Sequence, residues 1–350
     1  MMHNFPLGLS YDDVLLIPQH STINSRQDVD LSTQITPKLK LKIPLISINM
    51  SDVTGVEMAT AMGKLGGLGL LPRFISIESQ AEMVAKVKKA GVYAVPAIGI
   101  REGYLENVQK LLNAGADAVT IDVAHGHLQK CLDATKTIKN TYRNLDVISG
   151  VVATYEAASD LFKAGADSVR VGVGPGTICI TRIVTGFGVP QITAVLEVSR
   201  AAKKFKRTVI CDGGTKNSGD VVKGLAAGAS AVIAGSQFAG CDEAPGKVVT
   251  INGKKYKTYN ASTSAPEKLK QLENNGISKN SVKHVEGVES FVPCKGPVSD
   301  VIDNILTGVR SGFSYAGAKN VSQLWRKAKF MRVSSAGRKE NGAHDVITSW

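Results

Sequence analysis

The chain has few aromatic residues, no paired cysteines and no long apolar run, and each absence excludes a class of protein. Its five cysteines are odd in number and include no Cys-x-x-Cys pair, which argues against a disulfide framework and a zinc site. Aromatic residues make up 5% of the sequence, too few for a surface on which nucleic-acid bases stack. Residues 1–19 carry polar residues throughout and no signal peptide, so we expect a reduced, cytoplasmic protein without a membrane segment.

Acidic residues are outnumbered by basic ones, 30 against 42, which gives a formal net charge of +12. The lysines are dispersed apart from short runs at 38–42 and 203–207. We therefore expect no nucleic-acid partner, and the charge fits a field that steers an anionic small substrate equally well. A hydrophobic content of 43% with 35 glycines indicates a globular, turn-rich protein.

Short apolar segments alternate with segments of helical periodicity along the first two thirds of the chain. Several helical segments end on the same alanine-glycine-alanine signature, at 113–117, 163–167 and 226–230, where glycine supplies a left-handed helix stop. Eight strands in strict β-then-α order over about 200 residues predict an α/β fold, the (β/α)8 TIM barrel. A doubly wound sheet is the alternative, but no glycine-rich dinucleotide fingerprint follows the first strand. The expected strands are Ile43–Asn49, Gly67–Leu71, Tyr93–Gly99, Ala118–Val123, Asp146–Gly150, Ser168–Val173, Thr208–Cys211 and Ala231–Ala234.

In such a barrel the active site lies at the carboxyl ends of the strands, so the residues after each strand are the candidates. Small residues follow the seventh and eighth strands, at Gly213-Gly214 and Gly235-Ser236, which suits phosphate binding by backbone N–H groups. These ends predict a site for a phosphorylated metabolite. Polar residues also follow other strands, namely Asn49-Met50, Arg73, Asp122 to His127 and Asp212.

The loop after the sixth strand, residues 172–191, carries the most informative pattern in the chain. Five of its residues are glycines, which predicts a tight loop with an exposed backbone rather than a helix. Within it lies Cys179, flanked by the hydroxyls of Thr177 and Thr181. A thiol among exposed N–H groups is stabilised as a thiolate and attacks an electrophilic carbon. We therefore expect Cys179 to be a nucleophile rather than a small buried residue.

Residues 240–350 are too many for a simple tail to the barrel. Residues 251–258 predict a hairpin around Asn252-Gly253, and the polar segment 262–285 is typical of a flap over the rim. Helical periodicity returns at 297–310. We expect one barrel domain over residues 1–350. Within it, a mobile flap covers about residues 256–296, and a C-terminal helix and tail cover residues 297–350.

Five segments spread over nearly the whole chain resemble the IMP dehydrogenase/GMP reductase family. They are Tyr11 to Pro18, the glycine loop, Asp212 to Gly214, Ala239 to Gly246 and Lys295 to Val298. The resemblance implies a (β/α)8 barrel, a homotetramer and a loop cysteine that attacks C2 of a purine nucleotide. It also implies a potassium ion held by backbone carbonyls of Gly174, Gly176 and Cys179.

The resemblance assigns roles to further residues at the predicted rim. Cys179 is the nucleophile, and Thr181 with Glu286 handles the protons that let ammonia leave. Contacts to the purine nucleotide fall on Ser47, Met50, Arg73, Thr177, Asp212, Gly213, Gly214, Gly235, Ser236 and Tyr259. Contacts to a nicotinamide cofactor, NADPH or alternatively NAD, fall on Asp122, Ala124, His125 and Gly126.

Two enzymes of this family run related chemistry in opposite directions. The reductase deaminates GMP to IMP with NADPH, and the dehydrogenase oxidises IMP to XMP with NAD. Dehydrogenases activate water with an Arg-Tyr pair on the flap, and residues 262–285 contain neither residue type. The CBS module that most dehydrogenases insert is missing as well. We therefore expect a GMP reductase that acts through a covalent Cys179 adduct.

Other features keep two alternatives open. Segments 242–246, 335–340 and 344–346 resemble the dehydrogenase, which would use another base here, such as Lys283 or His284. A non-catalytic nucleotide- or RNA-binding barrel is the third reading, against which the intact thiol loop speaks. Three positions depart from both enzyme patterns and bear on contacts to the base and the cofactor: Val151, Ala261 and Ser51-Asp52.

Overall fold

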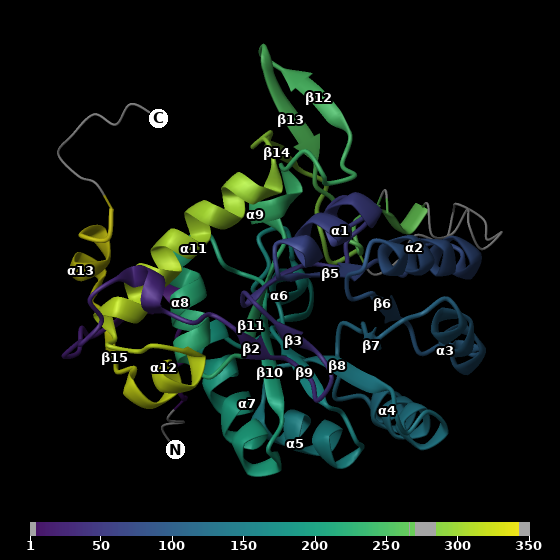
Figure 1. The fold of residues 1–350 in the computed structure, drawn as a ribbon, viewed down its shortest axis with the longest axis horizontal. Helices are drawn as coiled ribbons and strands as arrows, with labels where there is room; N and C mark the ends of the chain where they lie inside the picture. The colour runs from purple at the N-terminus through teal and green to yellow at the C-terminus, as the bar shows by residue number, and fades with distance from the viewer. Residues whose placement is uncertain (1–4, 266, 270–284, 343–350) are drawn as a thin grey trace.

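Eight parallel strands close into a barrel, which confirms the predicted (β/α)8 fold (Figure 1). The computed structural model describes residues 5–265, 267–269 and 285–342. Neighbouring strands pair in chain order, and the last strand pairs with the first, where Val232 lies opposite Leu45. The barrel strands are β4 (Leu45–Ser47), β5 (Leu68–Leu71), β6 (Val95–Ile98), β7 (Ala118–Ile121), β8 (Asp146–Val152), β9 (Ser168–Val171), β10 (Thr208–Asp212) and β11 (Ala231–Ala234).

Helices follow the strands and cover the outside of the barrel (Figure 1). The helices after β4 to β10 are α1 (Val56–Lys64), α2 (Ile77–Lys89), α3 (Tyr104–Asn113), α4 (Gln129–Thr141), α5 (Tyr155–Lys163), α7 (Gln191–Phe205) and α8 (Ser218–Ala226). The helix α11 (Val298–Tyr315) takes the place of the helix after the last barrel strand. It packs between α8 and α1, although a long segment separates it from β11.

Local sequence explains where these helices begin and end. The residue before α2 is Ser76 and the residue before α5 is Thr154. The side chain of each accepts a hydrogen bond from a backbone N–H of the first turn of its helix. After α3, α5 and α8 the residues Gly115, Gly165 and Gly228 take φ values of 100°, 105° and 113°. These are the left-handed stops that the alanine-glycine-alanine signature predicted.

Strand ends differ from the predicted ones by one or two residues. The strand β9 ends at Val171 rather than Val173, because Gly172 and Gly174 both take positive φ and turn the chain away. The strand β8 runs on to Val152 with a shift in its register against β9, an irregularity that local periodicity does not reveal.

Apolar side chains fill the barrel interior, so it is a packed core and not a pore. The hairpin of β2 (Thr33–Gln34) and β3 (Lys40–Leu41) closes the amino end, where the Ile35 carbonyl accepts the Thr208 hydroxyl at the start of β10. The interior cluster contains Ile35, Leu39, Leu41, Ile46, Leu68, Leu70, Val95, Ala118, Ile148, Ile210, Ala231 and Ile233.

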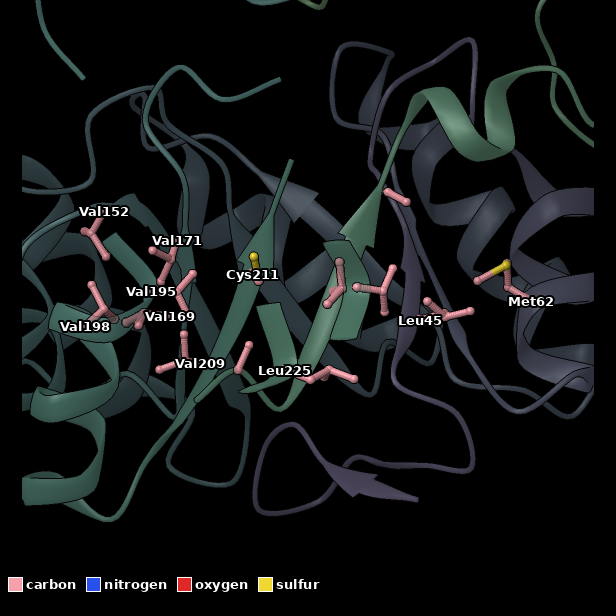
Figure 2. Packing of buried hydrophobic residues seen from close by; sticks show 14 of the residues in the cluster. Leu45, Met62, Val152, Val169, Val171, Val195, Val198, Val209, Cys211 and Leu225 are labelled. Atoms are coloured by element: carbon pink, nitrogen blue, oxygen red, sulfur yellow. The ribbon is translucent and has the colours of Figure 1, made fainter. Parts of the chain in front are cut away.

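A second apolar layer lies between the strands and the surrounding helices. Figure 2 shows Val169 and Val171 of β9 beside Val195 and Val198 of α7. Because this layer and the interior cluster occupy the body of the barrel, space for a ligand remains at the carboxyl rim.

A small antiparallel sheet projects away from the barrel between β11 and α11 (Figure 1). The short helix α9 (Ser236–Ala239) leads to it. The strands β12 (Val248–Ile251) and β13 (Lys254–Thr258) form the predicted hairpin, with φ of 49° and 75° at Asn252 and Gly253. A third strand, β14 (Phe291–Pro293), pairs with β13, so both ends of the expected flap belong to a sheet.

The segments before and after the barrel run together along one side of it. The strand β1 (Val14–Leu16) pairs antiparallel with β15 (Phe330–Arg332). None of the helices in the described part of the chain combines the length and apolar character needed to cross a membrane. The remaining elements are η1 (Tyr11–Asp13), η2 (Arg26–Asp28), α6 (Thr181–Thr185), α12 (Val321–Lys327) and α13 (Ser335–Lys339).

Candidate active site

A cavity of about 260 Å³ opens at the carboxyl rim of the barrel. Its walls come from the ends of seven barrel strands and from two segments beyond the barrel, around residues 259–263 and 286. The structure therefore brings most of the predicted residues to one place. Those that line the cavity are Met50, Arg73, Asp122, Ala124, Gly176, Thr177, Cys179, Gly213, Gly214, Gly235, Ser236, Tyr259 and Glu286.

The loop after β9 presents Cys179 to the cavity because its glycines allow close turns. Gly174 lies at φ 79°, and a Cβ at this position would be 2.6 Å from Cγ of Arg182. The Arg182 guanidinium donates to two loop carbonyls and ties the ends of the loop together. The Cys179 N–H donates to the Gly176 carbonyl at 3.1 Å, which forms a tight turn just before the thiol.

Three side chains form a series of hydrogen bonds that begins at this thiol. The Cys179 thiol donates to Oγ1 of Thr181 at 3.2 Å, and the Thr181 hydroxyl donates to Oε2 of Glu286 at 2.7 Å. The backbone also holds Glu286 there, because the Ile180 N–H donates to its carbonyl at 2.9 Å. Such a series can carry a proton between a nucleophile and a carboxylate.

The other cysteines have different surroundings, and all five are free thiols. Burial raises the pKa of Cys211 to about 11 and that of Cys241 to about 12, and it also raises the pKa of Cys131. These three remain protonated and pack in the core. Cys294 is half-buried and lies outside the cavity lining, whereas Cys179 faces the cavity.

A row of alternating charges runs from β5 to β10 beside the cavity. Nε of Arg73 donates to Asp122 at 2.9 Å, and Arg170 reaches the other oxygen of Asp122 at 3.3 Å. Arg170 also donates to Asp212 through two nitrogens, at 2.9 and 2.7 Å. Arg170 is absent from the residues expected from the sequence. Its signal there is an arginine inside the apolar strand 168–171, a position where a charge needs partners.

The two carboxylates of this row differ in pKa because they contact different numbers of arginines. Burial opposes ionisation of Asp122, but the charges of Arg73 and Arg170 outweigh it and hold the pKa below its usual value. Burial raises the pKa of Asp212, and Arg170 offsets only part of this effect. Asp122 is therefore the more firmly ionised of the two.

Hydroxyls and glycines gather on the β10 and β11 side of the cavity. Gly213 and Gly214 take φ values of 86° and 84°, which turns the chain sharply after β10. The hydroxyls of Thr177 and Ser236 lie 3.3 Å apart across the rim. Ser47 is not part of the lining: it is fully buried and accepts the hydroxyl of a neighbouring threonine at 2.8 Å.

Tyr259 reaches over this side from the end of β13. A Cβ on Gly235 would lie 2.5 Å from the phenol oxygen, so the absence of a side chain there makes room for the ring. Burial raises the pKa of Tyr259, and the phenol stays neutral and able to donate a hydrogen bond.

The segment after β7 is divided between the cavity and the surface. Asp122 and Ala124 line the cavity, whereas His125 is exposed and Gly126 is buried outside the lining. Nε2 of His127 lies 3.0 Å from a carboxylate of α5, away from the thiol. Only the first part of the predicted cofactor segment is thus placed beside Cys179.

The positions that depart from the family pattern also lie at this rim. Val151 and Ala261 line the cavity. Asp52 accepts the Asn260 N–H at 3.0 Å and so anchors the segment next to Tyr259. Lys283, His284 and residues 344–346, named above for the dehydrogenase alternative, lie outside the described residues.

The carbonyls expected to hold a cation, those of Gly174, Gly176 and Cys179, belong to the loop that carries the thiol. The Gly176 carbonyl accepts one hydrogen bond, from Cys179, and a carbonyl oxygen has a second lone pair. Within the described ranges no group of three or more His, Cys, Asp or Glu side chains is arranged to hold a metal ion. A monovalent cation bound by backbone oxygens of this loop stays a prediction.

The known proteins that resemble the chain carry two enzyme names within one family. A family model described as the IMP dehydrogenase / GMP reductase domain matches residues 8–344. The chain is 34% identical to inosine-5'-monophosphate dehydrogenase from Nitrosopumilus maritimus, over 98% of this chain and 99% of that protein. It is 33% identical to GMP reductase from Leishmania donovani, over 97% of each. The alignment with the first spans 472 positions against 350 residues here, so that relative contains a long segment absent from this chain.

The fold agrees with these sequence relationships. A solved structure of a cysteine-to-alanine variant of GMP reductase from Trypanosoma brucei, in complex with guanosine 5'-monophosphate, matches with a TM-score of 0.93. The two sequences are 30% identical, and the match covers 98% of this chain and 99% of that one. By sequence and by fold, the chain belongs to the IMP dehydrogenase/GMP reductase family of oxidoreductases.

Proposed function

We propose that the protein is a GMP reductase that converts GMP to IMP and ammonia with NADPH. The observation that carries the proposal is the hydrogen-bonded series from Cys179 to Thr181 at 3.2 Å and from Thr181 to Glu286 at 2.7 Å. The flap sequence, which contains no water-activating Arg-Tyr pair, supports the same conclusion. The series supplies what deamination needs, a nucleophile and a route for a proton. The missing pair removes what hydrolysis to XMP needs.

The residues of the series account for the bonds that change. The Cys179 sulfur bonds to C2 of the purine, and the bond from C2 to the exocyclic nitrogen breaks. The thiol proton passes from Cys179 to Thr181 and then to Glu286, along the hydrogen bonds of 3.2 and 2.7 Å, and it leaves with ammonia. A nicotinamide cofactor held at Asp122 and Ala124 would supply a hydride to C2. As that C–H bond forms, the Cys179 sulfur leaves C2 as a thiolate and IMP is released.

Other residues of the rim would hold the two nucleotides and the cation. Asp122 stays ionised in the wall of the cavity that Cys179 also lines, which fits hydrogen bonds from the ribose hydroxyls of the nicotinamide nucleotide. The glycine pair Gly213-Gly214 and Ser236 suit the phosphate of GMP. Carbonyls of the thiol loop would hold potassium and stiffen the loop, and we expect a homotetramer as in the family.

An IMP dehydrogenase without a CBS module is the second candidate, because relatives at 34% and 33% identity carry the two different names. Two of the dehydrogenase-like segments have structural contacts here. Arg338 of α13 pairs with Asp12 at 2.7 Å, and Glu243 accepts the Val298 N–H at the start of α11 at 2.9 Å. These contacts support the fold and involve no residue of the cavity lining, so they favour neither enzyme.

The two candidates are separated by absorbance at the nicotinamide band, with GMP plus NADPH in one assay and IMP plus NAD in another. We expect GMP-dependent oxidation of NADPH, and XMP formation slower by about 10²–10⁴-fold, the usual contribution of a general base. Robust XMP production without GMP-dependent oxidation would reject the reductase. Activity in neither assay, with RNA binding insensitive to mononucleotides, would favour the non-catalytic alternative.

Within the reductase reaction, Thr181→Ala and Glu286→Gln should slow deamination about 10²-fold or more, because each removes a step of the proton route. Hydride transfer is measured in a separate assay that starts from IMP and oxidised cofactor, and its rate should change far less. The matched control is Glu289→Gln, an exposed carboxylate three residues along the same segment. Equal slowing of both steps would contradict the assigned roles.

A further inference from the structure

The segment that carries Glu286 is the middle one of three extended segments. On one side it meets the thiol loop, through a β-bridge between Cys179 and Gly287 and a bond from the Val288 N–H to a loop carbonyl at 3.1 Å. On the other side it meets the cavity wall, where the Ala261 N–H donates to the Val288 carbonyl at 3.3 Å. The position of Glu286 therefore depends on how closely these three segments approach one another.

The approach is limited by the side chains of Ala261 and Gly287. A Cβ built on Gly287 would overlap Cβ of Ala261 and would lie 3.0 Å from Oγ1 of Thr263. Gly287 is buried and its φ is outside the left-handed region, so the glycine is needed for space and not for backbone conformation. Ala261 is 8% exposed and its other side forms part of the cavity wall.

We propose that Ala261 and Gly287 form a matched steric pair, one methyl group against none, that sets the distance between Glu286 and Thr181. Both are positioning residues, because they act on the reaction through Glu286. The pair is particular to this chain in one respect: Ala261 is a departure from the glycine usual in the family pattern. The proposal rests on the proposed function only in assuming that Glu286 takes part in the reaction.

The expected effect of a second methyl follows from contact distances. Two methyl carbons are in contact at about 3.5–4.0 Å, so an alanine at Gly287 would force the segments apart by about 1 Å or more. Glu286 is the next residue, and its carboxylate would leave the Thr181 hydroxyl that it now meets at 2.7 Å. A misplacement of about 1 Å in a catalytic constellation costs about 10²-fold in rate.

The test exchanges the methyl group between the two positions. We expect Gly287→Ala to lower kcat about 10²-fold with little change in nucleotide KM, and Ala261→Gly is measured alone as the reference for the double variant. The double variant, Ala261→Gly with Gly287→Ala, has one methyl again and should regain at least about tenfold. The control is Gly337→Ala in α13, where an added Cβ meets nothing closer than 3.6 Å.

A second measurement reports the approach of the segments without any purine reaction. Alkylation of Cys179 by iodoacetamide, followed on its own peptide by mass spectrometry, should be several-fold faster in Gly287→Ala because the bridge over the thiol is disturbed. It should return toward the original rate in the double variant. If neither purine reaction is found, that result rejects only the proposed function. The alkylation rate still tests the pair of Ala261 and Gly287 in that case. Unchanged kcat and alkylation in Gly287→Ala, or a double variant as impaired as the single one, would overturn the proposal.

Discussion

Among single residues, Cys179 shows most directly how neighbours define a role. It lies half-buried in a turn, with Thr181 at 3.2 Å, whereas Cys131, Cys211 and Cys241 are fully buried. We expect Cys179→Ser to lower turnover by several orders of magnitude, as removal of a nucleophile does in other enzymes, because a serine hydroxyl ionises far less readily than a thiol. Turnover is measured at the nicotinamide band and GMP binding by calorimetry.

Binding of GMP should persist in this variant, since the expected phosphate contacts come from other strands. Cys294→Ser, a half-buried thiol outside the cavity, is the matched control and should keep full activity. A Cys179→Ser protein with a near-normal rate would show that the thiol is structural.

Asp122 makes stability depend on pH at the acidic end. Burial opposes its ionisation, but Arg73 and Arg170 outweigh burial and keep its pKa below the ordinary value of about 3.9. Its contribution to stability is complete above that value and is lost as the pH falls through the lower, folded-state pKa. In Asp122→Asn we therefore expect a smaller loss of unfolding free energy between about pH 5 and about pH 2.5, measured by urea unfolding.

Asp212 provides the control of opposite sign. Burial raises its pKa, so its contribution is present below the ordinary value and is lost as the pH rises through the raised one. Asp212→Asn should therefore increase the loss of stability on acidification relative to the original protein. A change in the same direction for both variants would contradict the two pKa directions.

At the scale of elements, two aspartates join neighbouring βα units at the amino end of the barrel. Asp117, just before β7, accepts Nζ of Lys88 from α2 at 2.8 Å. Asp167, just before β9, accepts Nζ of Lys139 from α4 at 2.7 Å and the Val147 N–H of β8 at 3.0 Å. Each aspartate is the last residue of an alanine-glycine-alanine-aspartate signature, so one short motif both stops a helix and ties the unit to the preceding one.

Removal of the second of these carboxylates should destabilise the fold. Asp167→Ala removes the carboxylate that pairs with Lys139 and Arg207 and leaves a buried N–H group without its acceptor, which we expect to cost about 3 kcal/mol in urea unfolding. Activity of the folded fraction should stay unchanged, because the stability face of a barrel is opposite its active site. The control is Asp160→Ala, a 38% exposed carboxylate whose surface contacts with Lys163 and His127 are worth about 0.5 kcal/mol each. Equal losses in the two variants would contradict the assignment.

At the scale of the whole molecule, charge is distributed unevenly between the surface and the site. The chain has a net charge of +12, whereas the row beside the cavity balances two arginines with two aspartates. The excess positive charge therefore lies outside that row. We expect it to act on an anionic nucleotide at long range, by steering its approach, and to leave orientation to the rim.

This division of charge predicts that salt changes the rate at which substrate and enzyme meet and leaves the later steps unchanged. With potassium held constant, raising sodium chloride from about 0.01 M to about 0.15 M shortens the screening length from about 30 Å to about 8 Å. We expect kcat/KM for GMP to fall several-fold while kcat stays nearly constant, measured from initial rates. A kcat/KM that is insensitive to salt would show that the net charge plays no part in substrate capture.

Much of the fold could be predicted because its signals are local. Apolar runs located the barrel strands to within about two residues, and the glycines at 115 and 165 ended helices as expected. The candidate site followed from one further rule, that the carboxyl ends of parallel strands meet at one edge. Arg73, Asp122 and Gly213 were placed at the rim in this way.

By itself, then, the sequence determined the number and order of the βα units, the thiol loop and most of the residues at the rim, because each depends on residues close together in the chain. Only the tertiary structure decided which of them touch. Arg170 joins Asp122 to Asp212, and β14 pairs with β13. Glu286 meets Thr181 from 105 residues away, and the backbone of Gly287 lies where an added Cβ would overlap Ala261. Such contacts depend on how distant segments pack, and no local pattern in a single chain records that.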